Sequence, residues 1–269
     1  MATIGRKTEI SEFLDSLCQQ TVQDFEVIIV DQNASGFLDE VIKPPRPFPI
    51  RHILSSRKGV SANRNIGLDA AVGSVVCFPD DDCKYYPNTI ETALKYLAST
   101  DCDMLMGRIW DRQAQCDIIK RWPKSEYLPS RKDLYKISSS ITIFSKRTGM
   151  RFCEQIGAGA QYPSNEDFEY IARSFEEGAT LKYVPSLELW HPQQTFLNIP
   201  IQKAFLYGVG FGFVCKNLSN TSIYYLFLWI LSLCFHSARL LRGVFMRDKG
   251  MIQYSYAAFS GRVHGYFFA

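Results

Sequence analysis

Three consecutive aspartates that follow a short apolar run constrain this chain more than any other stretch. Ser74–Phe78 is apolar and rich in β-branched residues, which is the pattern of a buried strand. Pro79 cannot donate a hydrogen bond within a sheet, so it marks the end of that strand. Asp80, Asp81 and Asp82 come next. If the backbone stays extended, alternation places Asp80 and Asp82 on one side and Asp81 on the other.

These adjacent carboxylates repel one another, and a fold holds them together most easily around a cation. Oxygen ligands suit Mg²⁺ or Mn²⁺, and such sites usually combine one or two carboxylates with substrate phosphates. The carboxyl end of a strand in an α/β sheet is also where ligands usually bind. We therefore expect Mg²⁺ or Mn²⁺ at this triplet. A solvated acidic turn is the alternative that the local sequence leaves open.

Composition bounds the class of protein. The chain has 269 residues, of which 46% are hydrophobic, so it can build one large domain or one domain with an appendage. Its net charge of +3 is too mild to indicate nucleic acid but suits an anionic substrate or membrane surface. The eight cysteines include no Cys-x-x-Cys pair, which predicts buried thiols in a reducing compartment. Residues 3–9 show no apolar signal-peptide segment, so we expect a cytoplasmic protein.

Helical and strand patterns alternate along the first 190 residues. Residues 1–6 resemble the end of a strand, and Thr8 and Ser61 are plausible helix N-caps. We predict strands at 25–30, 50–54, 74–78, 103–108, 140–144 and 180–184, and helices around 10–17, 61–71, 90–97 and 168–175. Residues 110–136 are basic and aromatic and show no clear period.

Polar side chains recur at the ends of these predicted elements. Asp31 follows the strand at 25–30, and Arg64 lies near a helix N-terminus, which favours anions. Glu166 and Asp167 begin a helix, and His191 follows the last strand, where it could complete a metal site. Each has a structural alternative: a turn former, an ordinary basic surface, acids that match the helix dipole, or a structural histidine.

The C-terminal third changes character. Residues 207–212 are rich in glycine without the spacing of a phosphate-binding loop. Ile223–Phe235 is almost wholly apolar, yet shorter than the ~20 residues that a spanning helix needs. Four basic residues follow it: Arg239, Arg242, Arg247 and Lys249. This pattern predicts a helix on a membrane surface with a basic flank. A buried helix packed on the rest of the protein is the alternative.

Together these motifs resemble family 2 glycosyltransferases. The matching features are a strand ending in Asp31, Ser-x-x-Arg-Asn-x-Gly at 61–67, Asp-Asp-Asp at 80–82 and Glu-Asp at 166–167. The resemblance covers residues 2–192. It implies an α/β protein of the GT-A fold, a Rossmann-like mixed sheet flanked by helices, followed by a C-terminal helical and partly membrane-associating segment. We expect a catalytic domain at 1–198 and a helical region at 199–269.

The resemblance also implies how a nucleotide-sugar donor binds. Thr3 and Arg6 would lie in the first nucleotide-binding loop, Asp31 would accept a hydrogen bond from the base, and Arg64 would contact the nucleotide or its diphosphate. Asp80 is implied near the ribose. The full donor-binding set is Thr3, Arg6, Asp31, Arg64, Asp80 and Asp81.

Metal binding and catalysis are assigned in the same way. Asp80 and Asp82 match the Asp-x-Asp pair of the family, and His191 matches the position of a further metal ligand in some relatives. Asp167 matches the catalytic base of inverting members. One departure concerns the N-terminus, because Met1 stands where the family's first strand ends, and we expect the true start upstream.

The implied activity is transfer of a sugar from a UDP- or GDP-sugar to a hydroxyl of a glycan or lipid-linked acceptor. We expect a metal-dependent reaction with inversion, in surface polysaccharide or glycolipid synthesis, on the cytoplasmic face of the membrane. A nucleotidyltransferase would normally carry a glycine-rich, lysine-containing loop, which 2–7 does not supply, and a phosphatase would carry an Asp-x-Asp-Gly-Thr run. A non-catalytic membrane-associated scaffold would leave the polar residues at the strand ends unexplained.

Overall fold

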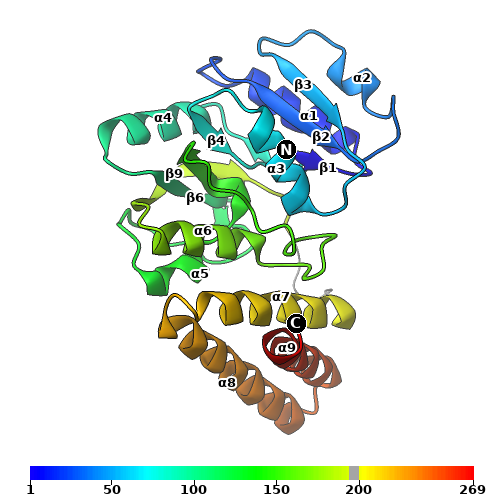
Figure 1. Ribbon diagram of the computed structural model, residues 1–269, viewed down its shortest axis with the longest axis vertical. Coiled ribbons are helices and arrows are strands. Elements are labelled where there is room, and N and C mark those ends of the chain that lie inside the picture. Colours follow the sequence, from blue (N-terminus) through cyan, green and yellow to red (C-terminus); the bar gives the residue numbers. More distant parts are fainter. Residues whose placement is uncertain (194–199) are drawn as a thin grey trace.

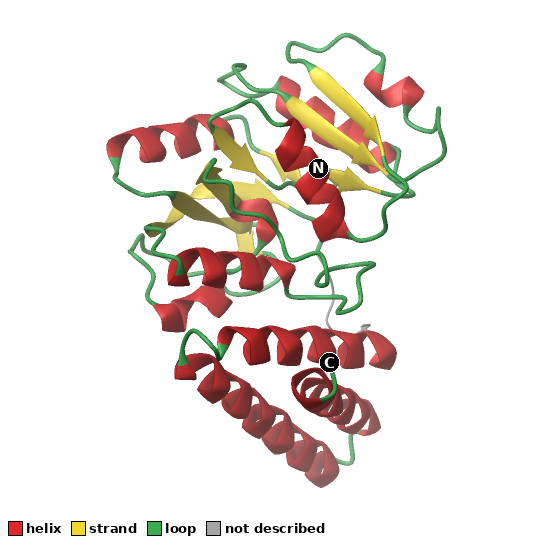
Figure 2. Cartoon of the chain, viewed as in Figure 1, coloured by secondary structure: helices red, strands yellow, loops and turns green. Residues whose placement is uncertain are grey.

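The computed structural model describes residues 1–193 and 200–269. An α/β part contains all of the described strands, and three long helices follow it along the long axis of the molecule (Figures 1 and 2). The N-terminus lies within the α/β part, whereas the C-terminus lies between the last helices. The layered α/β architecture agrees with the fold class expected from the sequence.

The first sheet is parallel and has three strands in the order β1-β2-β3. These are β1 (Ala2–Thr3), β2 (Val27–Asp31) and β3 (Ile50–Leu54). Helix α1 (Thr8–Cys18) connects β1 to β2, α2 (Asp39–Ile42) connects β2 to β3, and α3 (Val60–Ala70) follows β3. Thr3 pairs with Asp31, so the carboxyl ends of the first two strands meet at one edge.

The second sheet has six strands, with the order β4-β8-β6-β9-β5 and β7 paired with β6. The strands are β4 (Val75–Cys77), β5 (Lys84–Tyr85), β6 (Met104–Asp111), β7 (Cys116–Asp117), β8 (Ile143–Lys146) and β9 (Leu181–Trp190). Only β6 and β9 pair in parallel among them. The helices of this part are α4 (Thr89–Ser99), α5 (Leu134–Ile137) and α6 (Glu166–Glu176), with 3₁₀ turns at Arg131–Asp133 and Ser140–Thr142.

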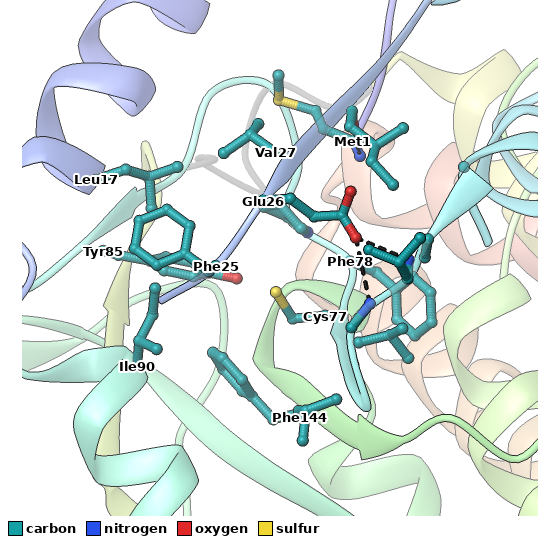
Figure 3. Close-up of a pocket in the computed structure, with 18 of the residues that line it drawn as sticks. Met1, Leu17, Phe25, Glu26, Val27, Cys77, Phe78, Tyr85, Ile90 and Phe144 are labelled. Atoms are coloured by element: carbon teal, nitrogen blue, oxygen red, sulfur yellow. Dashed lines mark hydrogen bonds between the residues drawn. The ribbon is translucent and has the colours of Figure 1, made fainter. Parts of the chain in front are cut away.

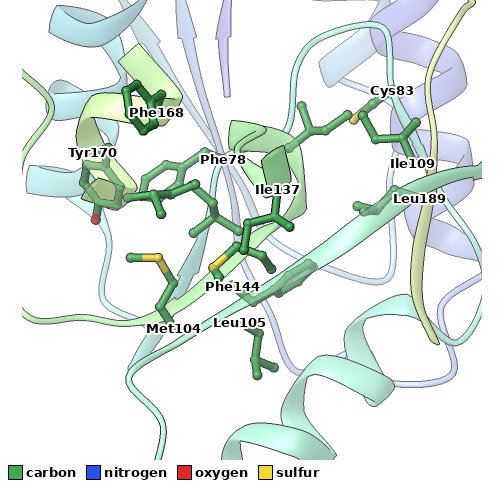
Figure 4. Close-up of a cluster of buried hydrophobic side chains, with 14 of the residues drawn as sticks. Phe78, Cys83, Met104, Leu105, Ile109, Ile137, Phe144, Phe168, Tyr170 and Leu189 are labelled. Carbon is green, nitrogen blue, oxygen red and sulfur yellow. The ribbon is translucent and has the colours of Figure 1, made fainter. Parts of the chain in front are cut away.

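Aromatic packing fixes α6 against the end of β4 (Figure 4). The ring of Phe152 stacks on Tyr170 of α6 with 4.3 Å between centroids. Phe78, which directly follows β4, meets Phe152 edge-on at 4.9 Å. All three residues are buried, and such aromatic pairs contribute about 0.5–1.5 kcal/mol each beyond the area that they bury. This packing holds the start of α6 near the aspartate triplet.

The three C-terminal helices are α7 (Ile201–Leu218), α8 (Ile223–Met246) and α9 (Lys249–Phe267). The glycine-rich stretch 207–212 lies inside α7, where it packs against α9. A Cβ on Gly212 would lie 2.3 Å from the carbonyl oxygen of Arg262, and one on Gly265 only 1.9 Å from that of Val209. The two helix backbones are therefore in direct contact, which glycine alone permits.

Helix α8 exposes much of its apolar surface. Phe227, Phe235 and Phe245 are 59%, 59% and 90% exposed. Among the described residues, α8 alone has the length and composition that could cross a membrane, and 17% of its most apolar window is buried. The helix is longer than the predicted run 223–235, and it includes Arg239 and Arg242.

The structure corrects several local predictions. Thr8 is the first residue of α1, and the N-cap is Lys7. The N-cap of α3 is Gly59, and Ser61 lies inside the helix, where its hydroxyl donates to the Ile156 carbonyl. The predicted strand at 140–144 begins with a 3₁₀ turn, and only Ile143–Lys146 is extended.

Two further expectations need correction. Strand β9 continues through Pro185 as far as Trp190, well beyond the predicted end at 184. Cys116 and Cys234 are exposed, so not every cysteine is a buried thiol. The expected domain boundary at 198 lies outside the described residues.

The contact between α7 and α9 predicts that Gly265→Ala destabilises the protein. Because the new methyl group must displace backbone atoms, we expect a loss of about 1–3 kcal/mol in the free energy of unfolding. Gly250→Ala is the matched control, since its Cβ would lie 3.5 Å from its nearest neighbour, and it should gain up to about 1 kcal/mol. Urea unfolding measures both variants. Equal stability of the two would show that the helices do not pack this closely.

Candidate donor and metal site

The site begins where β1 and β4 end. Asp80, Asp81 and Asp82 follow β4, and the buried Thr3 at the end of β1 donates its hydroxyl to Asp81 Oδ2 at 2.7 Å. Arg6 lies across the triplet: its Nε is 3.4 Å from Asp81 Oδ1, and its Nη1 pairs with Asp82. The structure therefore brings together five residues that the sequence singled out.

Asp80, Asp82 and His191 form the one candidate metal cluster found among the described residues. Their ligand atoms all lie within 4.8 Å of one another, and His191 Nε2 is 3.2 Å from Asp82 Oδ1. His191 Nδ1 is 2.8 Å from the carbonyl oxygen of Pro192, so that nitrogen must carry the proton. Its Nε2 is thereby directed at the carboxylates, as in a metal-binding histidine. Two carboxylates and an imidazole are a suitable donor set for Mn²⁺ or Mg²⁺.

The local charges keep Asp82 ionised. Burial alone would raise its pKa, but hydrogen bonds from His191 and Arg6 outweigh burial and lower the pKa to about 2. Burial raises the pKa of Asp81, against the hydrogen bond from Thr3. Burial would lower the pKa of His191, but the Asp82 carboxylate outweighs it and the net pKa is raised. His191 and Arg6 therefore hold Asp82 as a carboxylate, the form in which it can bind a cation.

Arg64 joins the triplet to the start of α6. Its Nη2 donates to Asp80 Oδ1 at 2.8 Å and to Ser140 Oγ at 2.9 Å, while Nη1 is 3.4 Å from Glu166 Oε1. Its side chain is only 3% exposed. The sequence implied a contact between Arg64 and the diphosphate, whereas the guanidinium is directed at two carboxylates of the protein.

Asp31 is fully buried at the end of β2 and is held by its neighbours. Its Oδ1 accepts hydrogen bonds from the backbone and side-chain nitrogens of Asn33, at 2.8 and 2.7 Å. Its Oδ2 is 3.0 Å from Nε2 of His52. His52 was not among the predicted site residues, because its partner is apparent only from the parallel pairing of β2 with β3.

Glu166 and Asp167 open α6, as predicted. Asn165 before them has a left-handed backbone with φ of 67°, which turns the chain into the helix. Burial raises the pKa of Glu166, Arg64 opposes that rise, and the charge of Asp167 adds to it. The family resemblance assigned the base to Asp167 alone, and the structure separates the two acids by position, since Arg64 contacts Glu166.

Lys120 is a site residue that the sequence missed. It lies in the stretch 110–136, whose mixed composition gave no period to place it. Its Nζ donates to the Ser138 carbonyl at 2.5 Å and lies 4.6 Å from the Trp122 ring. Burial lowers the pKa of Lys120 to about 8, and the charge of Asp167 opposes this. Lys120 is therefore a cation that acts on Asp167.

A cavity lies elsewhere, between the two sheets (Figure 3). It measures about 590 Å³ and is lined mainly by apolar residues of β2, β4 and their flanks, including Val27, Cys77 and Phe144. Of the site residues above, only Arg64 also lines it. The Met1 amino group donates to the Ile28 carbonyl there, and burial lowers its pKa to about 6. This apolar cavity does not suit a charged nucleotide.

Comparison with known proteins agrees with this geometry. The family model described as glycosyl transferase family 2 matches residues 1–161. An uncharacterised glycosyltransferase of Haemophilus influenzae is 34% identical over 94 residues, which is 35% of this chain and 31% of that protein. The chain thus spans less than a third of that relative's length.

Two groups of solved structures share the fold. The chain resembles S. aureus TarS 1–349 in complex with UDP-GlcNAc, with a TM-score of 0.60 and 16% identity over 99% of this chain and 91% of TarS 1–349. It also resembles the mannosyltransferase PcManGT from Pyrobaculum calidifontis in complex with GDP-Man and Mn²⁺, with a TM-score of 0.61 and 14% identity over 99% of this chain and 85% of PcManGT. With the family match, these likenesses show that the chain belongs to glycosyl transferase family 2 and has the GT-A fold.

Proposed function

We propose that this enzyme transfers a hexose from a nucleotide-diphosphate sugar to an acceptor hydroxyl with inversion at the anomeric carbon. The observation that carries the proposal is the cluster of Asp80, Asp82 and His191, linked through Arg64 to the start of α6. The buried guanidinium of Arg64 thereby contacts Asp80 of the cation site through Nη2 and Glu166 at the start of α6 through Nη1. This arrangement supports departure of an anionic group and activation of a hydroxyl.

The donor is proposed to be a UDP- or GDP-sugar. TarS was solved with UDP-GlcNAc and PcManGT with GDP-Man, which supports a nucleotide sugar as the class. In this chain Asp31, at the end of β2, would accept a hydrogen bond from the base. Thr3, Arg6, Asp80 and Asp81 would bind the ribose and diphosphate, and Arg64 would hold Asp80 in place.

Asp80, Asp82 and His191 would hold Mg²⁺ or Mn²⁺. When bound, that ion would supply positive charge to the departing nucleoside diphosphate. Arg6 is well placed to share this task, because its guanidinium lies beside Asp81 and Asp82 and its side chain is 39% exposed. It can therefore turn towards a phosphate oxygen, which binds guanidinium strongly.

Asp167 is proposed as the general base. The acceptor oxygen forms a bond to the anomeric carbon as the bond from that carbon to the diphosphate oxygen breaks, and Asp167 takes the hydroxyl proton. Glu166 is less suited to this role, since Arg64 contacts its carboxylate. Lys120 adds a positive charge that the carboxylate of Asp167 attracts.

We further propose that residues 199–269 bring the catalytic domain, residues 1–198, to the cytoplasmic face of a membrane. The exposed apolar side chains of α8 and the basic residues Arg239, Arg242, Arg247 and Lys249 support this. An interfacial helix of this kind binds by apolar burial and attraction to anionic lipids. A glycan or lipid-linked acceptor at that surface would fit surface polysaccharide or glycolipid synthesis.

The first test removes one proposed metal ligand. Asp82→Ala should abolish Mn²⁺-dependent binding of UDP and GDP, because one carboxylate and the orientation of His191 are lost. Asp101→Ala is the matched control, since Asp101 is an exposed carboxylate away from the cluster. Calorimetry with each nucleotide and Mn²⁺ gives the affinities. Binding by Asp82→Ala equal to that of wild type would refute the metal role.

The second test concerns the base. Asp167→Asn keeps the shape of the side chain but removes its basicity, so transfer should fall by about 10²–10⁴-fold while donor binding persists. Sugar transfer at saturating donor and acceptor measures the loss, and calorimetry checks the donor. Near-normal turnover would refute the role of Asp167 as base and leave it as an acid that stabilises the N-terminus of α6 through the helix dipole.

The third test addresses the membrane. A variant with Phe227→Gln, Phe235→Gln and Phe245→Gln should no longer float with vesicles that contain phosphatidylglycerol, because each fully buried Phe contributes about 1.5–3 kcal/mol. Leu128→Gln, which removes an apolar side chain that is 68% exposed on the α/β part, should float like wild type. Failure of the wild-type protein to float would contradict membrane binding.

A further inference from the structure

Arg262 of α9 is a cation with no acidic partner. Its Nη1 donates to the Ala258 carbonyl at 2.9 Å, its Nε is buried without a partner, and its guanidinium lies 4.9 Å from the Phe211 ring. None of the ion pairs among the described residues includes Arg262, and the sequence at 194–199 contains no Asp or Glu. Burial lowers its pKa. A partly buried guanidinium with an unpartnered buried N–H is costly, so a counter-ion is expected.

Two more unpartnered polar groups lie between α8 and α9. His236 Nδ1 and Ser255 Oγ are both buried without a hydrogen-bond partner, and their residues are 6% and 0% exposed. Trp229 of α8 donates to the Arg262 carbonyl of α9 at 3.0 Å, so these two residues lie side by side. Ser255 lies two helical turns before Arg262 on α9, and His236 lies two turns after Trp229 on α8. Because α8 and α9 are antiparallel, this spacing places His236 level with Ser255. The charge of Arg262 also lowers the pKa of His236, after burial, to about 4.

A line of aromatic contacts connects this cluster with the proposed base. The Tyr135 ring meets the Phe211 ring edge-on, with 5.1 Å between the ring centroids. The Arg262 guanidinium lies over the same Phe211 ring. Tyr135 also meets Phe168, the neighbour of Asp167, at 5.1 Å. Tyr135 is 41% exposed, so solvent reaches this line of contacts. Arg262 is therefore connected through Phe211 and Tyr135 to the start of α6, where the proposed base lies.

We propose that Arg262, His236 and Ser255 form an anion subsite that binds a phosphate group of the acceptor. That the phosphate belongs to the acceptor rests on the proposed glycosyl transfer, whereas anion binding itself does not. Guanidinium groups bind phosphate through paired N–H donors, and the serine hydroxyl adds another donor. Neutral His236 offers one ring N–H without adding positive charge. The substrate class is thus a phosphate-bearing acceptor, whether a soluble phosphodiester or the headgroup of a phosphate-bearing lipid.

The test measures binding of inorganic phosphate by the full chain, with chloride at equal ionic strength as the reference. Wild type should show a phosphate-dependent rise in Tm, and Arg262→Met should bind phosphate at least tenfold more weakly. Arg262→Met should still fold, because an apolar side chain of similar length removes a partly buried charge that has no acidic partner. Lys203→Met is the matched control, since Lys203 is an exposed cation over the Tyr207 ring of α7, and it should respond like wild type. Ser255→Ala provides a second, smaller change at the same place.

The two sources of phosphate are separated by vesicles. Phosphatidylcholine vesicles with and without phosphatidic acid are compared, and an Arg262-dependent preference for phosphatidic acid would identify a lipid headgroup. A response to inorganic phosphate alone would identify a soluble group. Asp82→Ala should keep the phosphate response even if it loses nucleotide binding, so failure of one proposal is distinguishable from failure of the other. The subsite is refuted if wild type shows no phosphate response in either arm, or if Arg262→Met retains it.

Discussion

The site depends on one buried guanidinium that is shared between carboxylates from distant parts of the chain. Arg64 of α3 donates to Asp80 after β4 and to Ser140 before β8, and it faces Glu166 at the start of α6. A buried arginine without partners would be strongly unfavourable, and so would the acids without it. The three segments therefore hold one another in place, and the aromatic packing of Phe152 and Tyr170 keeps α6 within reach.

The chemistry of the site was largely predictable from the sequence because it follows strand and helix ends. Alternation after a strand separated Asp81 from Asp80 and Asp82, and the structure pairs Asp81 with Thr3 while Asp80 and Asp82 converge with His191. The Glu166–Asp167 start of α6 followed from helical spacing. The difference between these two acids did not, because it arises from Arg64, which is remote in sequence.

Other features escaped prediction for identifiable physical reasons. Pro185 suggested the end of a strand, yet β9 continues to Trp190, and that extension delivers His191 to the cluster. Lys120 follows no periodic segment, so only tertiary structure places its charge near Asp167. The glycines at 207–212 were assigned no role from the sequence. They allow the close approach of α7 to α9, which depends on a partner helix that a local pattern does not contain.

The central claim is that Asp80, Asp82 and His191 form a divalent-cation site that binds together with a nucleotide diphosphate. The most direct measurement is a crystal structure of the protein with Mn²⁺ and UDP or GDP, with anomalous scattering used to locate manganese. The account predicts one strong anomalous peak in contact with Asp82 and the nucleotide phosphates, within reach of Asp80 and His191. A bound nucleotide without such a peak, or manganese at a different group of residues, would contradict it.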